Sequence, residues 1–176
     1  MKFTLKLAIS AALSASFLLG TASQSFAQGT PIGHGHLKGG PTPAAPAPSI
    51  IDLTFSLVEL PDGSLVGSGK LTKKSDGTWI LFDLTSYMFI GDTLYAAGPI
   101  TEAFNTDDPR RQVGATFFVA IQDNGDGGDG QAMDSFIEGG VPAVFGPLTI
   151  QQIIASIGPP PPEIFRQGIS GNIVIH

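Results

Sequence analysis

The chain has 176 residues, no cysteine and a formal net charge of −6, with fifteen acidic residues against nine basic ones. The lack of cysteine excludes disulfides, thiol catalysis and cysteine-based zinc or iron–sulfur sites. The acidic balance repels phosphate groups, so nucleic acid is not expected as a partner.

Residues 1–27 have the features of a signal peptide. Two lysines precede an apolar run from Leu7 to Gly20, and "SQSFAQ" supplies the small residues that favour cleavage after Ala27. The apolar run is shorter than the ~20 residues that a membrane span needs. No cysteine follows it for lipid attachment. We therefore expect export to the periplasm or the extracellular space, with no membrane span after cleavage.

Residues 28–49, "QGTPIGHGHLKGGPTPAAPAPS", contain mostly Gly, Pro, Ala and Thr and little that can be buried. This composition predicts a flexible linker whose proline-rich part is extended. His34 and His36 alternate with glycine, and imidazole is a good ligand for transition metals. Two histidines on a mobile segment make an unselective site, so the linker interpretation is favoured.

Residues 50–176 predict a single β domain. Leu53, Phe55 and Leu57 alternate with polar residues, and "PDGS" at 61–64 has turn chemistry. Further strand-like runs follow, separated by Gly, Asp and Pro: "SLVGSGKLT", "TWILFDLTSYMFI", "TLYAAGPITEAF", "QVGATFFVAIQD", "DSFIE" and "SGNIVIH". Short strands with frequent turns indicate a mostly β fold, either an antiparallel β-sandwich or a small β-barrel.

One short helix is predicted at about residues 149–157. Thr149 can cap it, Gln152 stands at the capping-box position, and Gly158 with Pro159 ends the pattern. A strand over "FGPLTIQQII" is the competing interpretation.

Residues 78–90 carry a candidate ligand-binding face. An uninterrupted strand would place Trp79, Asp83 and Tyr87 on one side of the sheet, together with Phe89. Flat rings beside hydrogen-bonding groups suit a sugar or an extended peptide. The alternative is that these aromatic side chains belong to the core and that Asp83 points to solvent.

The stretch "IQDNGDGGDGQAMD" at 121–134 is a candidate calcium loop. Calcium binds several carboxylate, amide or carbonyl oxygens, and the loop offers five such residues: Asp123, Asn124, Asp126, Asp129 and Asp134. The spacing departs from the EF-hand pattern, because Gly125 and Gly127 stand where that pattern has ligands. A solvated turn between two strands is the alternative.

Two segments also resemble a family. "FFVAIQDNGDGGDGQAMDSFI" and "GISGNIVIH", about 30 residues in all, are similar to segments of small exported bacterial β-proteins of unknown function. These proteins have a D-N-G loop before an Asp-x-Phe strand and end in Gly-Asn-Ile and a terminal His. The resemblance implies a compact β fold outside the cytoplasm and implies no activity. The usual Glu-Pro after D-N-G is replaced here by Asp126 and Gly127.

These observations favour a non-catalytic binding module whose ligand is a glycan or a protein. No G-x-S-x-G motif is present, and His176 is the one histidine outside the predicted linker. Two alternatives stay open. One is a polysaccharide hydrolase with two carboxylates taken from Glu59, Asp83, Glu102, Glu138 and Glu163. The other is a structural or matrix component that assembles through sheet edges.

Overall fold

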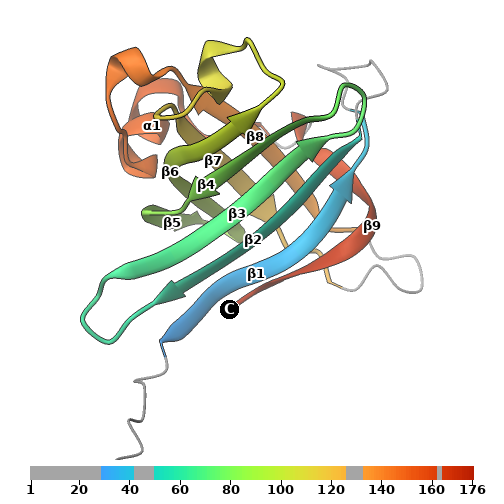
Figure 1. Ribbon diagram of the computed structural model, residues 1–176. Coiled ribbons are helices and arrows are strands. Elements are labelled where there is room, and N and C mark those ends of the chain that lie inside the picture. The colour runs from blue at the N-terminus through green and yellow to red at the C-terminus, as the bar shows by residue number, and fades with distance from the viewer. Residues whose placement is uncertain (1–28, 42–49, 126–132, 162–163) are drawn as a thin grey trace, which may run out of the picture.

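The computed structural model describes residues 29–41, 50–125, 133–161 and 164–176. Within these residues the chain forms nine antiparallel strands, one α-helix and two short 3-10 turns (Figure 1). The strands are β1 (Thr30–Gly39), β2 (Ile51–Glu59), β3 (Leu65–Lys73), β4 (Thr78–Asp83), β5 (Ser86–Ile90), β6 (Thr93–Phe104), β7 (Thr116–Gln122), β8 (Ser135–Val141) and β9 (Arg166–Ile175). The helix is α1 (Ile150–Ile157), and the turns are η1 (Pro109–Arg111) and η2 (Ala143–Phe145).

The strands pair in the order β4-β3-β2-β1-β9-β8-β7-β6-β5, and β4 pairs in addition with β6. The pairing therefore runs from β4 through seven other strands and back to β4, which gives a barrel-like closed sheet. β5 stands outside this ring as an extension along β6. The predicted mostly β fold with one short helix is confirmed, and closure favours the barrel-like alternative.

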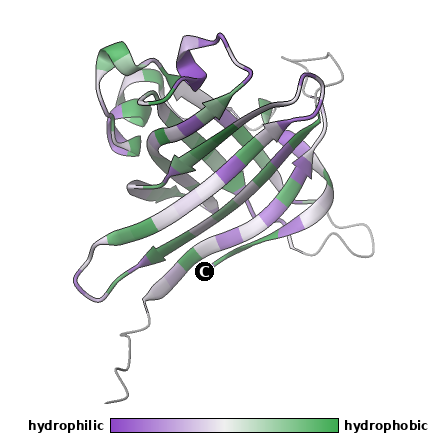
Figure 2. Cartoon of the chain, in the orientation of Figure 1, coloured by the Kyte–Doolittle hydropathy of each residue, from purple (hydrophilic) through white to green (hydrophobic). Residues whose placement is uncertain are grey.

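The interior of the ring is filled with aliphatic and phenyl side chains. Alternate residues of each strand point inward, as in β2, where Leu53, Phe55 and Leu57 are buried and the residues between them are more exposed. Phe82 and Phe117 stack in this interior with ring centroids 4.1 Å apart. Figure 2 shows the resulting alternation of hydrophobic and hydrophilic bands along the strands.

α1 covers part of the outer face of the sheet (Figure 1). Its buried residues Ile150 and Ile153 pack against Tyr95, Ala97 and Ala120, which form a second apolar cluster outside the ring. The helix begins with the predicted capping box of Thr149 and Gln152. No helix in the described part of the chain is both long and apolar enough to cross a membrane.

The prediction of a flexible linker over residues 28–49 is wrong for Thr30–Gly39, which form β1 between β2 and β9. The inward positions of β1 include glycines because neighbouring strands fill the space in front of them. A methyl group at Gly33 would lie 3.2 Å from the Leu94 side chain, and one at Gly39 would lie 2.6 Å from the Phe136 ring. Residues 42–49 and the predicted signal peptide lie outside the described residues.

The prediction of one uninterrupted strand over residues 78–90 is also wrong. β4 and β5 both pair with β6, Phe82 with Ile100 and Ser86 with Ala97. Between these pairs, the three residues 83–85 lie opposite only two residues of β6, Gly98 and Pro99. One extra residue of this kind is a bulge, and it reverses which side chains point inward. Even-numbered residues therefore face the interior in β4, whereas odd-numbered residues such as Tyr87 face it in β5.

Candidate functional site

The outer face of β2, β3 and β4 carries a groove of about 420 Å³. The ladder places its side chains in two rows across the strands. Thr54, Lys70 and Leu81 form one row, and Ser56, Ser68 and Asp83 form the next. Thr101 of β6 also lines the groove, and so do Gly69 and the buried Phe55 and Phe82. The outward side chains other than Leu81 are exposed, because the inward positions of the same strands are taken by core residues.

Among the described residues, the hydroxyl groups and the carboxylate of the groove have no hydrogen-bond partner within the protein. In the described parts of the chain no hydrogen bond joins the hydroxyls of Thr54, Ser56, Ser68 and Thr101 or the carboxylate of Asp83 to another group. The groove thus offers several hydroxyls, one ammonium and one carboxylate to a ligand. A shallow surface of this composition suits a hydroxylated ligand without net charge.

A pair of aromatic rings lies beside the groove. Trp79 precedes Leu81 and Asp83 on the outer face of β4, and its ring stacks on Phe104 of β6 with centroids 5.7 Å apart and planes inclined by 13°. Phe104 is 57 % exposed. The Lys70 ammonium, which lines the groove, lies 5.3 Å from the centre of the Trp79 ring. The aromatic pair and the groove are therefore continuous along β4.

Tyr87 does not share this face, so the predicted grouping of Trp79, Asp83 and Tyr87 is wrong in that respect. The bulge after β4 turns Tyr87 toward the interior cluster. Its hydroxyl donates a 2.7 Å hydrogen bond to the Glu59 carboxylate. That hydrogen bond, together with burial and the charge of Glu59, raises the pKa of Tyr87 above its ordinary value.

The described residues of the acidic loop form hydrogen bonds with the backbone of strand β9. Asp134 is only 2 % exposed, and its carboxylate accepts hydrogen bonds from the backbone N–H groups of Asn124, at 2.9 Å, and Ile173, at 2.7 Å. Asp123 accepts from the N–H groups of Gly125, at 2.9 Å, and Ile175, at 3.1 Å. The amide of Asn124 donates to the Met133 carbonyl.

These contacts join the D-N-G loop to the strand that contains the Gly-Asn-Ile segment. β8 pairs with β9 only at Ser135↔Gln167 and Phe136↔Arg166. Beyond that point the N–H groups of Ile173 and Ile175 meet aspartate carboxylates instead of a neighbouring strand. Asp126 and Asp129 lie outside the described residues, so calcium binding at this loop stays a prediction.

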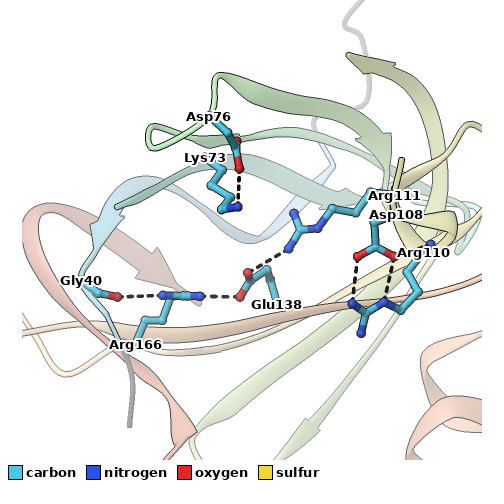
Figure 3. A network of polar contacts seen from close by, with 8 residues as sticks. All are labelled: Gly40, Lys73, Asp76, Asp108, Arg110, Arg111, Glu138 and Arg166. Carbon is cyan, nitrogen blue, oxygen red and sulfur yellow. Dashed lines mark hydrogen bonds and ion pairs between the residues drawn. The ribbon is translucent and has the colours of Figure 1, made fainter. Parts of the chain in front are cut away.

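Glu138 is buried at the end of the ring where η1 lies, and two arginines hold it (Figure 3). The Glu138 carboxylate is 3.1 Å from Arg111 Nη2 and 3.4 Å from Arg166 Nε. Arg166 also donates to the Gly40 carbonyl at 2.9 Å, which links β8, β9 and the end of β1. Glu138 is thus engaged in structural ion pairs, and Glu59 is engaged by Tyr87.

The other carboxylates proposed for hydrolysis are placed differently. Glu163 lies outside the described residues. Asp83 is the carboxylate that lines the groove, and Glu102 is exposed on β6 opposite Leu81. The hydrolase hypothesis is therefore restricted to Asp83 and Glu102 among the described carboxylates that it considered.

A second hollow, of about 490 Å³, lies between α1 and the strands β7 and β8. Its lining is mainly apolar and includes Phe118, Val141, Leu148 and Ile153. Phe145 and Ile157, which also line it, are 68 % and 65 % exposed. The guanidinium of Arg110 stands at its edge but is paired with Asp108.

The sequence indicated Trp79 and Asp83 but did not indicate the rest of the groove. The other groove residues could have been recognised only as outward-facing polar positions of predicted strands. These residues are Thr54, Ser56, Ser68 and Lys70. Their convergence depends on the register between strands, and Phe104 reaches Trp79 only because β6 pairs with β4.

Comparison of the chain with protein-family models, with curated proteins and with solved structures found no match.

Proposed function

We propose that this protein is an exported, non-catalytic binding module that holds a neutral oligosaccharide in the groove on β2, β3 and β4. The observation that carries the proposal is the alignment of the stacked Trp79–Phe104 pair with the row of unpartnered polar groups that ends at Asp83. An exposed aromatic surface can cover the apolar face of a sugar ring, while hydroxyls, ammonium and carboxylate bond to the sugar hydroxyls. Lys70 and Asp83 carry opposite charges, which favours a ligand without net charge.

Trp79 is the single tryptophan of the chain, so its fluorescence reports on the proposed site alone. We expect one class within a panel of neutral gluco-, xylo-, manno- and chito-oligosaccharides to shift or quench its emission. Calorimetric titration of that sugar should then show binding that weakens at least about tenfold in Phe104→Ala and in Asp83→Asn, a change of about 1.4 kcal/mol or more.

Phe145→Ala is the matched control, because it removes an exposed phenyl ring from the other hollow. It should leave sugar binding unchanged. Unaltered Trp79 emission across the whole panel at millimolar sugar would reject the proposal, as would equal weakening in the Phe145 variant. Release of shortened sugar during the titration would instead favour the hydrolase alternative and would reject the non-catalytic part.

A second candidate function is the binding of an apolar small molecule in the hollow beside α1. The exposure of Phe145 and Ile157 at its rim favours this candidate. A fluorescent apolar probe such as anilinonaphthalene sulfonate should bind the native protein and be weakened by Phe145→Ala but not by Phe104→Ala. Absence of probe binding to the folded protein would reject this candidate.

A further inference from the structure

All three histidines of the chain lie on one outer face of the sheet. His34 and His36 are exposed on β1, where they alternate with inward-facing residues. His34 pairs with Val174 of β9 and His36 with Asn172. His176 directly follows β9 and is exposed as well. The closed sheet thus brings together residues that are about 140 positions apart in the sequence.

His34 and His176 are in direct contact across the two strands. Their ring centroids are 5.7 Å apart, and the ring planes are inclined by 20°. The pairing Gly33↔Ile175 makes His176 a diagonal neighbour of His34 on the same face, a separation that ring side chains can span. The His176 N–H donates to the Ile32 carbonyl at 3.0 Å, so the backbone on both sides of the pair is hydrogen-bonded.

From this contact we propose that His34 and His176 bind a divalent transition metal ion such as Zn²⁺ or Cu²⁺ between β1 and β9. Imidazole nitrogen is a preferred ligand of these ions, with Zn–N distances of about 2.0–2.1 Å. Both side chains are exposed, so rotation of their rings can direct one nitrogen of each toward a shared ion. The net charge of −6 also attracts cations to the surface.

The site has two protein ligands. In the described parts of the chain no group of three or more His, Cys, Asp or Glu side chains is arranged to hold a metal. Water therefore completes the coordination, and we expect binding in the micromolar range or weaker. Since the ion bridges two strands of the folded state only, it also raises the melting temperature.

Calorimetric titration of untagged protein with zinc chloride tests the site. We expect one ion per chain, with affinity reduced at least tenfold in His34→Gln and in His176→Gln. His36→Gln is the matched control, because His36 is exposed on the same face of the same strand but lacks the ring contact. Magnesium chloride is the metal control, because this ion prefers oxygen ligands.

The proposal is overturned if millimolar zinc does not bind, or if His34→Gln or His176→Gln binds zinc as the unaltered chain does. It is also overturned if His36→Gln weakens binding as much as the other two variants, since the ion would then not be held by the cross-strand pair. Each variant changes an exposed side chain, and circular dichroism verifies that its fold is unchanged.

Discussion

The ring of strands closes differently at its two junctions, β4–β6 and β8–β9. At β4–β6, four consecutive residues of β4 have backbone partners on β6. At β8–β9 the ladder has only two residue pairs, and side chains replace the rest. Asp123 and Asp134 accept hydrogen bonds from backbone N–H groups of β9, and Glu138 forms an ion pair with Arg166. Acidic residues that resemble metal ligands in the sequence therefore act here in strand pairing.

The two junctions differ in how strongly a single substitution can destabilise them. A backbone ladder tolerates most side chains but is sensitive to close approach of the two chains. A junction made by buried carboxylates depends on single atoms, since loss of one acceptor leaves buried N–H groups unpaired.

Asp134→Ala should lower the free energy of unfolding by about 3 to 5 kcal/mol, because the N–H groups of Asn124 and Ile173 both lose their acceptor. Denaturant unfolding measures the change. Asp134→Asn keeps one acceptor oxygen and should lose about 1 to 3 kcal/mol, which covers the case in which the alanine variant does not fold. Asp83→Ala, at an exposed carboxylate, should change stability by less than about 0.5 kcal/mol. Equal effects at Asp134 and Asp83 would contradict the assigned role.

Glu138→Gln should destabilise the fold by about 2 to 4 kcal/mol, because it leaves Arg111 and Arg166 without their shared counter-charge in a buried position. Asp76→Asn is the control. It removes a carboxylate from an exposed ion pair with Lys73, and should lose no more than about 1 kcal/mol. The hydrogen bond from Lys73, together with hydrogen bonds from Thr78, lowers the pKa of Asp76 to about 2. A similar loss of unfolding free energy in both variants would show that the buried Glu138 ion pairs stabilise the fold no more than an exposed ion pair does.

Gly98→Ala tests the backbone-paired junction. A methyl group at Gly98 would lie 2.9 Å from the Asp83 carbonyl carbon and 3.0 Å from the Thr85 nitrogen, where the chain crosses from β4 to β5. We expect a loss of about 1 to 3 kcal/mol in chemical denaturation. Gly40→Ala meets its nearest neighbour at 3.5 Å and should be close to neutral. If Gly98→Ala were neutral too, the close approach of the chains at this bulge would not require glycine at position 98.

The smallest effect concerns alkaline pH. Burial raises the pKa of Tyr95, and the hydrogen bond to Glu59 raises that of Tyr87. A pKa that is higher in the folded state gives stability that is complete below the unfolded value of about 10 and is lost as pH rises through the folded value. Tyr87 lies on β5 and Tyr95 on β6. The loss of stability at alkaline pH therefore arises near the β4–β6 junction and not at β8–β9.

Unfolding experiments between about pH 9 and about pH 11 should show a shallower decline in Tyr87→Phe than in the unaltered chain. Asp134→Asn should leave the slope unchanged, because it alters the other junction. Identical slopes in the unaltered chain and Tyr87→Phe would contradict the link between this hydrogen bond and alkaline stability.

Local patterns in the sequence were sufficient for the class of fold and for several elements. Alternation in β2 and β7 and the Thr149–Gln152 capping box depend on residues close together in the chain, so they can be read without knowing any partner strand. The same reasoning located Trp79 and Asp83 on one face of β4. It did not extend to Tyr87, because the bulge is created by pairing with β6.

Other features depend on which strands are neighbours, and these required the folded structure. β1 looks like a linker because its inward glycines are covered by Leu94 and Phe136 from other strands. The roles of Asp123 and Asp134 as acceptors for backbone N–H groups of β9 cannot be read from the loop alone, because they require β9 beside the loop. The groove and the histidine pair likewise exist only after the register is set. Burial and hydrogen bonding are satisfied between strands distant in sequence, and no local pattern records which strand supplies the missing partner.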